Sequence, residues 1–344
     1  MSVALIWDEL LAAYRLGTSH PMQPARFVLA VETMRSWDLL APSSGDASDE
    51  GGETERAVIL RPEIASDADL ALAHDAGYIA HVKAAGADPS KAYGDHGLGA
   101  GDTPAFPRMH DAAALAVGAS ITALDAVLTG RVTRAFSPAG GLHHAMRDRA
   151  SGFCIYNDCV VAIERATRQH PGLRVAYVDI DAHHGDGVEA AFLERADVLT
   201  ASVHESGQFI FPGTGAARET GEGAGKGFAL NVPLLPHSGD EELLGALSGH
   251  VVPALRHFAP DVIVAQLGAD SHRGDPLTHL DVTIAGFLDA VRSLRDASEE
   301  LCGGRLVALG GGGYQPYTVV PRVWAGAMAV LLGRDVPDQA MSDA

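Results

Sequence analysis

The stretch RVAYVDIDAHHGDG, residues 174–187, decides the fold, because a buried-strand pattern runs directly into a dense group of metal-capable side chains. Its first part, Arg174 to Ile180, is rich in Val, Ile and Tyr and shows no polar alternation before Asp179. This pattern is typical of a strand covered on both faces of a parallel sheet. Because ligands of open α/β sheets bind beyond the carboxyl ends of the strands, the stretch predicts an α/β fold with a site at this strand end.

Five ionisable side chains emerge there: Asp179, Asp181, His183, His184 and Asp186. Asp181 and His183 are two residues apart, so on an extended segment they point to the same side and can share a metal ion. A solvated polar loop is the alternative interpretation. We disfavour it because so many ionisable groups at a buried strand end would repel one another or shift their pKa values without a partner.

Three further strand patterns end in candidate site residues, namely residues 132–136 before His143 and His144, residues 262–267 before Asp270, and residues 305–309 before Tyr314. The carboxyl ends of parallel strands meet at one edge of a sheet. Asp181, His183 and Asp270 would then form a set of two carboxylates and one imidazole with an open position for water, as a catalytic zinc site requires.

The other residues at this edge have the chemistry to complete a hydrolytic site. His143 and His144 would stand beside the water as proton acceptors, and Tyr314 would donate its hydroxyl to a developing oxyanion. Asp179 and Asp186 flank the ligand pair in the chain and would orient the two histidines.

Composition narrows the class of protein. The chain has 344 residues, of which 47% are hydrophobic, and a formal net charge of −19. Such an acidic surface disfavours binding to nucleic acid or to a membrane surface and favours cationic ligands. The three cysteines form no CxxC pair, which favours a reducing compartment. We find no basic leader segment and no uncharged span long enough for a bilayer, so we expect a soluble cytoplasmic protein.

Other segments give weaker indications. Residues 41–56 hold almost no apolar side chain and predict a flexible acidic insertion within a single domain covering residues 1–344. The long connection 96–110 contains Asp102, which taken alone is more typical of a turn, and Arg26 taken alone reads as a surface arginine. The glycine-rich residues 221–227 do not match a phosphate-binding loop, because Gly227 follows Lys226 where Ser or Thr is needed.

Six motifs in chain order resemble the histone deacetylase superfamily: PAGGLHHA, SGFCIYND, VDIDAHHGDGVE, FPGTG, QLGADSHRGDPL and LGGGGY. HGLGAGDTPAFP and DPLTHL resemble its bacterial acetoin-utilization branch. The resemblance covers nearly the whole chain. It implies a single-domain, arginase-like α/β fold of three layers, with a mainly parallel central sheet and helices on both faces.

The resemblance also implies roles for the site residues. Asp181, His183 and Asp270 would bind a single zinc or ferrous ion, and His143, His144 and Tyr314 would be catalytic. Asp179 and Asp186 would belong to the catalytic set as partners of the two histidines. Within this set His143 pairs with Asp179, His144 pairs with Asp186, and His144 is the general base. The implied reaction is hydrolysis of an acetyl-lysine-type amide to acetate and a free amine.

Substrate contacts follow from the same resemblance. Phe153 and Phe211 would line a channel for the acyl-lysine side chain, with Gly152 and Gly312 in the same substrate-binding set. Asp102 would hold the substrate backbone at the rim.

Further implications concern the product, a second ion and the substrate. Arg26 would lie on the internal path by which acetate leaves, which replaces the surface interpretation. Structural potassium is implied near Asp179, Asp181, His183, Ser202 and Val203. The acetoin branch suggests acetylated acetyl-CoA synthetase as substrate, and an acetylated small amine such as an acetylpolyamine is the alternative. Oligomeric state is left open.

Two rival functions share these motifs. A binuclear manganese ureohydrolase would need an Asp two residues after Asp270 to bridge its ions, and position 272 is His. A non-catalytic sensor of acetylated ligands would be expected to have lost a reactive group, whereas Tyr314 and the other reactive positions are filled.

Overall fold

The structure is a computed structural model that describes residues 2–42, 56–92, 94–99, 101–337 and 341. Most of the predicted acidic insertion at 41–56 therefore lies outside the described residues. The single domain expected over residues 1–344 stays a prediction.

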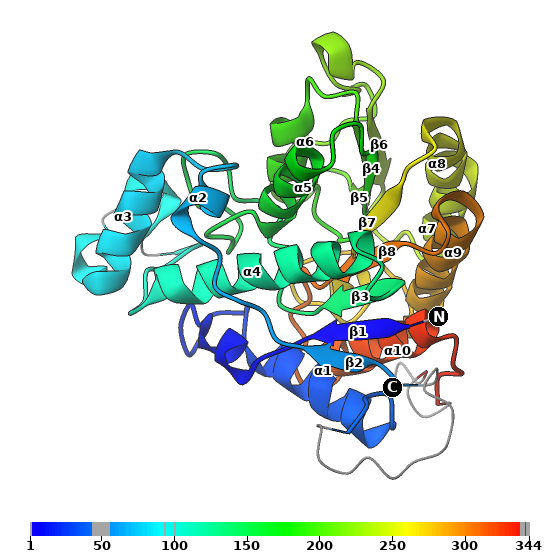
Figure 1. Cartoon of the computed structure of the whole chain (residues 1–344), viewed down its shortest axis with the longest axis horizontal. Helices are drawn as coiled ribbons and strands as arrows, with labels where there is room; N and C mark the ends of the chain where they lie inside the picture. The colour runs from blue at the N-terminus through cyan, green and yellow to red at the C-terminus, as the bar shows by residue number, and fades with distance from the viewer. Residues whose placement is uncertain (1, 43–55, 93, 100, 338–340, 342–344) are drawn as a thin grey trace.

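A single parallel sheet forms the centre of the molecule (Figure 1). In the described part of the chain it has eight strands in the order β2-β1-β3-β8-β7-β4-β5-β6, and every pairing is parallel. The strands are β1 (Val3–Ile6), β2 (Val58–Leu60), β3 (Arg134–Ser137), β4 (Val175–Asp179), β5 (Val198–Glu205), β6 (Ala229–Leu234), β7 (Val262–Gln266) and β8 (Leu306–Leu309).

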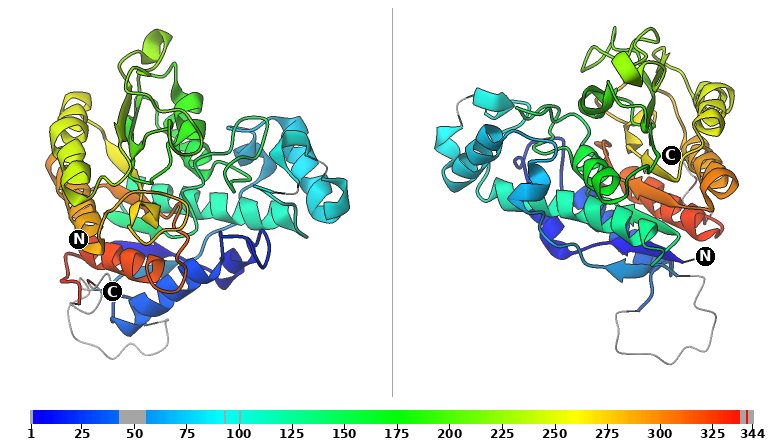
Figure 2. Two further views of the ribbon diagram at one scale, coloured as in Figure 1. Left: turned by 180° about the vertical axis from the view of Figure 1, so that it is seen from behind. Right: turned by 45° about the horizontal axis from the view of Figure 1, so that its top comes forward.

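Helices cover both faces of this sheet. They are α1 (Ala25–Ser36), α2 (Asp67–Leu70), α3 (Ala76–Ala87), α4 (Met109–Leu128), α5 (Asp158–Gln169), α6 (Asp186–Phe192), α7 (Asp240–Ala246), α8 (Val252–Phe258), α9 (Ile284–Cys302) and α10 (Val320–Leu332). Short 3-10 turns are Glu9–Ala13, Pro89–Lys91, Asp95–Gly97, Gly223–Gly225 and Ala269–Ser271, and the π-helical turn Leu247–Val251 joins α7 to α8. Figures 1 and 2 show α4 and α5 on one face and α1, α9 and α10 on the other. The expected three-layer α/β fold is confirmed.

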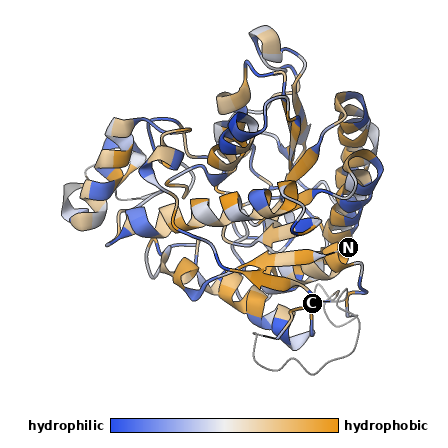
Figure 3. Cartoon of the chain, in the orientation of Figure 1, coloured by the Kyte–Doolittle hydropathy of each residue, from blue (hydrophilic) through white to orange (hydrophobic). Residues whose placement is uncertain are grey.

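Burial explains the sequence patterns. All residues of β1, β3, β4, β5, β7 and β8 are buried, which accounts for their lack of polar alternation. Figure 3 shows these strands as largely hydrophobic, whereas α8 and α9 carry hydrophilic residues outward. Helix α4 is long and apolar enough to cross a membrane, yet most of it is buried against the sheet and α5, as expected for a core helix.

Strand β6 differs from the sequence expectation, which contained no strand there. Asn231 and Pro233 interrupt its apolar pattern, and β6 pairs only with β5 at the edge of the sheet. An edge strand tolerates proline because one of its sides needs no ladder hydrogen bonds. Helix α1 begins at Ala25, directly after Pro24, so Arg26 lies in its first turn.

Candidate metal and catalytic site

The site lies at the carboxyl ends of four neighbouring strands, β3, β8, β7 and β4. The candidate residues follow these strands in the chain: His143 and His144 follow β3, Tyr314 follows β8, Asp270 follows β7, and Asp181 and His183 follow β4. Their adjacency brings together side chains that are up to about 170 residues apart in the chain, because a parallel sheet aligns all carboxyl ends at one edge.

Three ligand atoms converge at this edge. The Nδ1 atom of His183 lies 3.3 Å from Oδ1 of Asp181 and 3.0 Å from Oδ2 of Asp270. All three side chains are buried, and their ligand atoms lie within 4.8 Å of one another. The opposite carboxylate oxygens are held by the protein: Oδ2 of Asp181 accepts the Gly312 N–H at 2.7 Å, and Oδ1 of Asp270 accepts the Ala182 N–H at 2.8 Å.

The charge of this group fits a divalent cation. Two buried carboxylates face one imidazole, and burial together with repulsion from Asp181 raises the pKa of Asp270 to about 6. A cation between the three ligand atoms would neutralise the excess negative charge, and three protein ligands leave a position for water. Glycine is required beside the ligands, because a Cβ atom at Gly312 would lie 1.9 Å from Oδ2 of Asp270 and one at Gly268 would lie 1.9 Å from Oδ2 of Asp181.

Two buried His–Asp pairs stand next to the ligands. His143 Nδ1 lies 2.7 Å from Oδ2 of Asp179, and His144 Nδ1 lies 2.7 Å from Oδ1 of Asp186. The Nε2 atoms of the two histidines are 3.0 Å apart, so a proton must lie between them.

The two histidines differ in basicity. Burial disfavours the charged form of both, but attraction to Asp179 and Asp181 outweighs it at His143 and raises its pKa to about 9. At His144, burial and repulsion from His143 lower the pKa to about 4. Without a metal ion, the shared proton therefore belongs to His143, and the imidazole of His144 is neutral and able to accept a proton.

Two polar side chains that the sequence did not single out hold the loop 141–145, which carries His143 and His144 and is called the histidine loop below. Asn157 caps the N-terminus of α5 and donates its amide to the carbonyls of His143 and Ala145, at 3.1 and 3.0 Å. Buried Asp158 accepts the N–H groups of Gly141 and Leu142 at 2.9 and 2.7 Å. Both residues belong to the quoted motif SGFCIYND, so a polar pair at a helix start was the available signal.

Gln266 was also missed. Its amide donates to Oδ2 of Asp181 at 2.8 Å, and its oxygen accepts the Gly268 N–H at 2.7 Å. A single polar residue that ends the apolar strand β7 was the signal for this ligand-orienting role.

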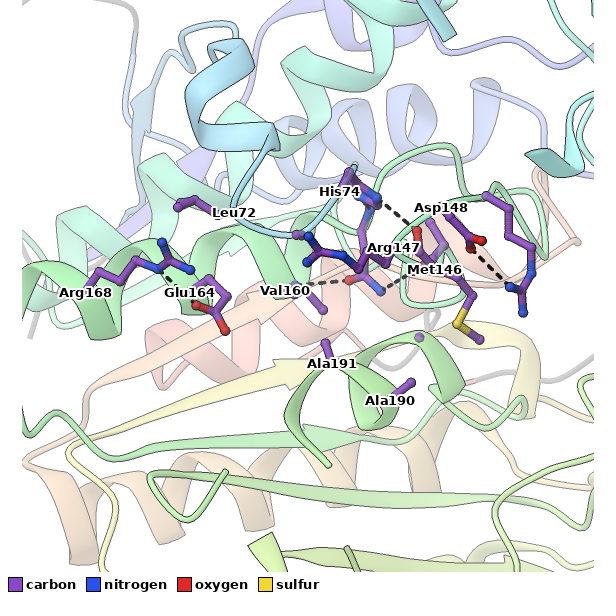
Figure 4. A pocket seen from close by; sticks show the side chains of 15 residues that line it. Leu72, His74, Met146, Arg147, Asp148, Val160, Glu164, Arg168, Ala190 and Ala191 are labelled. Carbon is purple, nitrogen blue, oxygen red and sulfur yellow. Dashed lines mark hydrogen bonds and ion pairs between the residues drawn. The ribbon is translucent and has the colours of Figure 1, made fainter. Parts of the chain in front are cut away.

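A pocket of about 440 Å³ lies behind the histidine loop, between that loop, α5 and α6 (Figure 4). Figure 4 shows His74 reaching the loop, and its Nδ1 lies 3.0 Å from the Met146 carbonyl. Arg168 at the edge of the pocket pairs with Glu164, and Arg149 pairs with Asp148. The lining of this pocket includes none of the three ligand residues and neither histidine of the loop.

Tyr314 lies at the end of the glycine loop 310–313. Its N–H donates to Oδ2 of Asp275 at 2.6 Å, which anchors the loop on the β7 side. Arg26 supports the same loop by donating to the carbonyls of Gly311 and Gly313 at 2.7 and 3.1 Å. Arg26 is 1% exposed, so its interpretation as a surface arginine is wrong.

The two phenylalanines expected in the channel lie beside catalytic candidates. The Phe153 ring lies 5.6 Å from that of Tyr314, and the half-exposed Phe211 ring lies 4.9 Å from that of His144. Asp102 is exposed near the same place, but its Oδ2 accepts the Gly152 N–H at 2.7 Å. Asp102 therefore already has a partner within the protein.

Comparison with known proteins decides the family. The model of the histone deacetylase domain matches residues 20–331. This chain belongs to the histone deacetylase family. It is 42% identical over 332 residues to the acetoin utilization protein AcuC of Bacillus subtilis (strain 168), covering 96% of this chain and 82% of that protein. It is 34% identical over 338 residues to AcuC of Staphylococcus aureus (strain MSSA476), covering 97% and 82%.

Solved structures of this family share the fold. The crystal structure of a histone deacetylase homologue from Aquifex aeolicus matches with a TM-score of 0.85 and 34% identity, covering 98% of this chain and 86% of that chain. A structure of such a homologue complexed with SAHA matches with a TM-score of 0.85 and 33% identity. The histone deacetylase family is metal-dependent, and the buried Asp–His–Asp group of this chain could bind the metal. Family and site together support a metal-dependent deacetylase.

Proposed function

We propose that the protein hydrolyses the amide of N-acetyl-lysine in proteins to acetate and free lysine, with one zinc ion held by Asp181, His183 and Asp270. The observation that carries this proposal is the convergence of Oδ1 of Asp181, Nδ1 of His183 and Oδ2 of Asp270 beside two His–Asp pairs. When bound, the zinc ion supplies Lewis acidity that polarises the acetyl carbonyl and makes water more acidic.

The side chains of this protein would do the rest. Phe153 and Phe211 guide the acyl-lysine chain, and His144 accepts the proton of the attacking water. Tyr314 donates its hydroxyl to the carbonyl oxygen as negative charge develops there. The C–N bond then breaks, and the lysine nitrogen takes a proton from the histidine pair as it leaves. Asp179 and Asp186 keep both imidazoles oriented through each proton transfer.

The rival functions fit the site less well. His272, at the position where a second manganese ligand is needed, accepts the Gly274 N–H at its Nδ1 atom at 3.0 Å and is not among the converging ligands. Buried ionisable pairs with shifted pKa values are typical of catalytic sites. A non-catalytic sensor would have no need for two such His–Asp pairs.

Other parts of the proposal rest on the family and on composition. Iron(II) is the alternative metal, and a potassium site near Asp179 and Ser202 stays a prediction. The proposed location is the cytoplasm. Acetylated acetyl-CoA synthetase is proposed as a substrate because relatives are named for acetoin utilization.

Substrate class is tested by Asp102→Asn. If Asp102 accepts N–H groups of a peptide backbone through its free oxygen and its charge, the asparagine variant should lower kcat/KM for acetyl-lysine peptides severalfold to about a hundredfold. Acetylspermidine offers no such pair of N–H groups and should lose much less. Asparagine is chosen over alanine because its carbonyl oxygen can still accept the Gly152 N–H, so the channel wall is retained.

The assay uses purified protein of verified metal content with both substrates. Equal losses on both substrates would contradict recognition of the peptide backbone by Asp102. Faster turnover of acetylspermidine than of any peptide by the wild type would favour a small-molecule deacetylase.

A further inference from the structure

The channel wall at Phe153 rests on an unusual tight turn, residues 151–154. The Ser151 carbonyl accepts the Cys154 N–H at 2.8 Å, and the Ser151 N–H donates to the Cys154 carbonyl at 3.1 Å. Both central residues have positive φ, 52° at Gly152 and 68° at Phe153. Hairpin turns of this kind favour asparagine and glycine, and a phenylalanine at positive φ is strained unless its surroundings hold it.

This turn contacts two parts of the catalytic site. The Phe153 ring lies edge-on to Tyr314, with 5.6 Å between ring centroids. On its other side, a Cβ atom at Gly152 would lie 2.3 Å from Cδ2 of His144, so the glycine packs directly against that imidazole. A displacement of the turn would therefore move the channel wall and also loosen the packing of His144.

Two side chains from distant segments hold the turn. Tyr14, just after the Glu9–Ala13 turn, donates its hydroxyl to the Phe153 carbonyl at 2.8 Å and accepts the Ile155 N–H at 3.0 Å. Its side chain is buried, so water does not replace these bonds when they are lost. Asp102, from the long connection before α4, accepts the Gly152 N–H at 2.7 Å.

We propose that Tyr14 and Asp102 are positioning residues that clamp the turn 151–154 and thereby fix both the Phe153 wall and the packing of His144. Asp102 then has a role within the channel as well as the proposed one at the rim. Through Tyr14, the segment that contains the Glu9–Ala13 turn then helps to position catalytic residues, although Tyr14 touches no reacting atom. This inference deepens the proposed function and rests on it.

Tyr14→Phe tests the clamp. The variant keeps the ring but leaves the Phe153 carbonyl and the Ile155 N–H without their partner. We expect kcat/KM for an acetyl-lysine peptide to fall roughly tenfold, as expected for loss of one buried hydrogen-bonding group, with part of the loss in kcat because His144 is affected. Metal content should not change.

Tyr78→Phe is the matched control. Tyr78 is also a buried tyrosine, and its hydroxyl donates to the Ile155 carbonyl at 2.5 Å, next to the turn but outside it. Both variants remove one buried hydroxyl from the same region. We expect both to lower the melting temperature, but only Tyr14→Phe to lower kcat/KM substantially.

Backbone amide exchange, followed by mass spectrometry over residues 151–155, tests the clamp without any turnover. Exchange should accelerate in Tyr14→Phe and Asp102→Ala, and stay near the wild-type rate in Tyr78→Phe and Asp102→Asn. Unchanged exchange in the first two variants, or equal kinetic losses in Tyr14→Phe and Tyr78→Phe, would overturn the inference. An inactive wild type with the expected exchange pattern would overturn the proposed function and leave the clamp standing.

Discussion

Asp270→Ala should abolish metal binding and with it all measurable deacetylation. The Asp270 carboxylate supplies one of the converging ligand atoms through Oδ2, while its Oδ1 holds the Ala182 N–H next to His183. Its removal deletes one ligand and frees the backbone between the other two. Because three protein ligands are the usual minimum for a catalytic zinc site, the remaining pair should not retain the ion through purification. Elemental analysis of metal per chain is the measurement.

Tyr314→Phe is the matched variant for this experiment. It changes the same edge of the sheet but removes no ligand atom, so it should retain the metal and lose about a hundredfold or more in kcat, as expected for one oxyanion donor. Full metal occupancy in Asp270→Ala would show that the ligand assignment is wrong.

His144→Ala should lower kcat by about a hundredfold to ten-thousandfold, the range in which general bases contribute. The reason lies in the environment of the pair without the metal: burial and repulsion from His143 lower the pKa of His144, whereas attraction to Asp179 and Asp181 raises the pKa of His143. The expected order is therefore a larger loss for His144→Ala than for His143→Ala. Steady-state kinetics of both variants, at equal metal content, measures it.

The two alanine variants control for each other, since each removes one imidazole and leaves one aspartate without its histidine. Mild and equal losses would mean that neither histidine accepts the proton of the water. A larger loss for His143→Ala would reverse the assignment of the base.

The sequence predicted the parts of the fold that depend on burial. Strands such as β4 and β7 are apolar throughout because helices cover both faces, and that pattern is visible without a structure. The candidate ligands were predictable for a related reason. Asp181 and Asp270 follow buried strands within a few residues, and the carboxyl ends of parallel strands are where ligands bind in such sheets.

What the sequence could not supply were contacts between distant loops. Strand β6 was missed because Pro233 contradicts a strand pattern unless the strand is known to lie at an edge. Gln266 and Asn157 look like ordinary polar residues until the fold places them against Asp181 and the histidine loop.

Asp102 shows the same limit in a different way. Its interpretation as a rim residue gave no hint of its bond to the Gly152 N–H, because the two residues are 50 positions apart. For this reason Asp102→Ala would weaken the channel wall along with any substrate contact, and asparagine is the informative substitution.

The central claim is that one metal ion at this site drives hydrolysis of an acetyl-lysine amide. The most direct measurement strips the purified protein of metal, adds zinc in steps, and follows acetate released from an acetyl-lysine peptide. The account predicts no acetate from the metal-free protein and full activity at about one zinc ion per chain, as a three-ligand catalytic site requires. No acetate at any zinc or iron(II) concentration, or activity that appears only with two ions per chain, would contradict it.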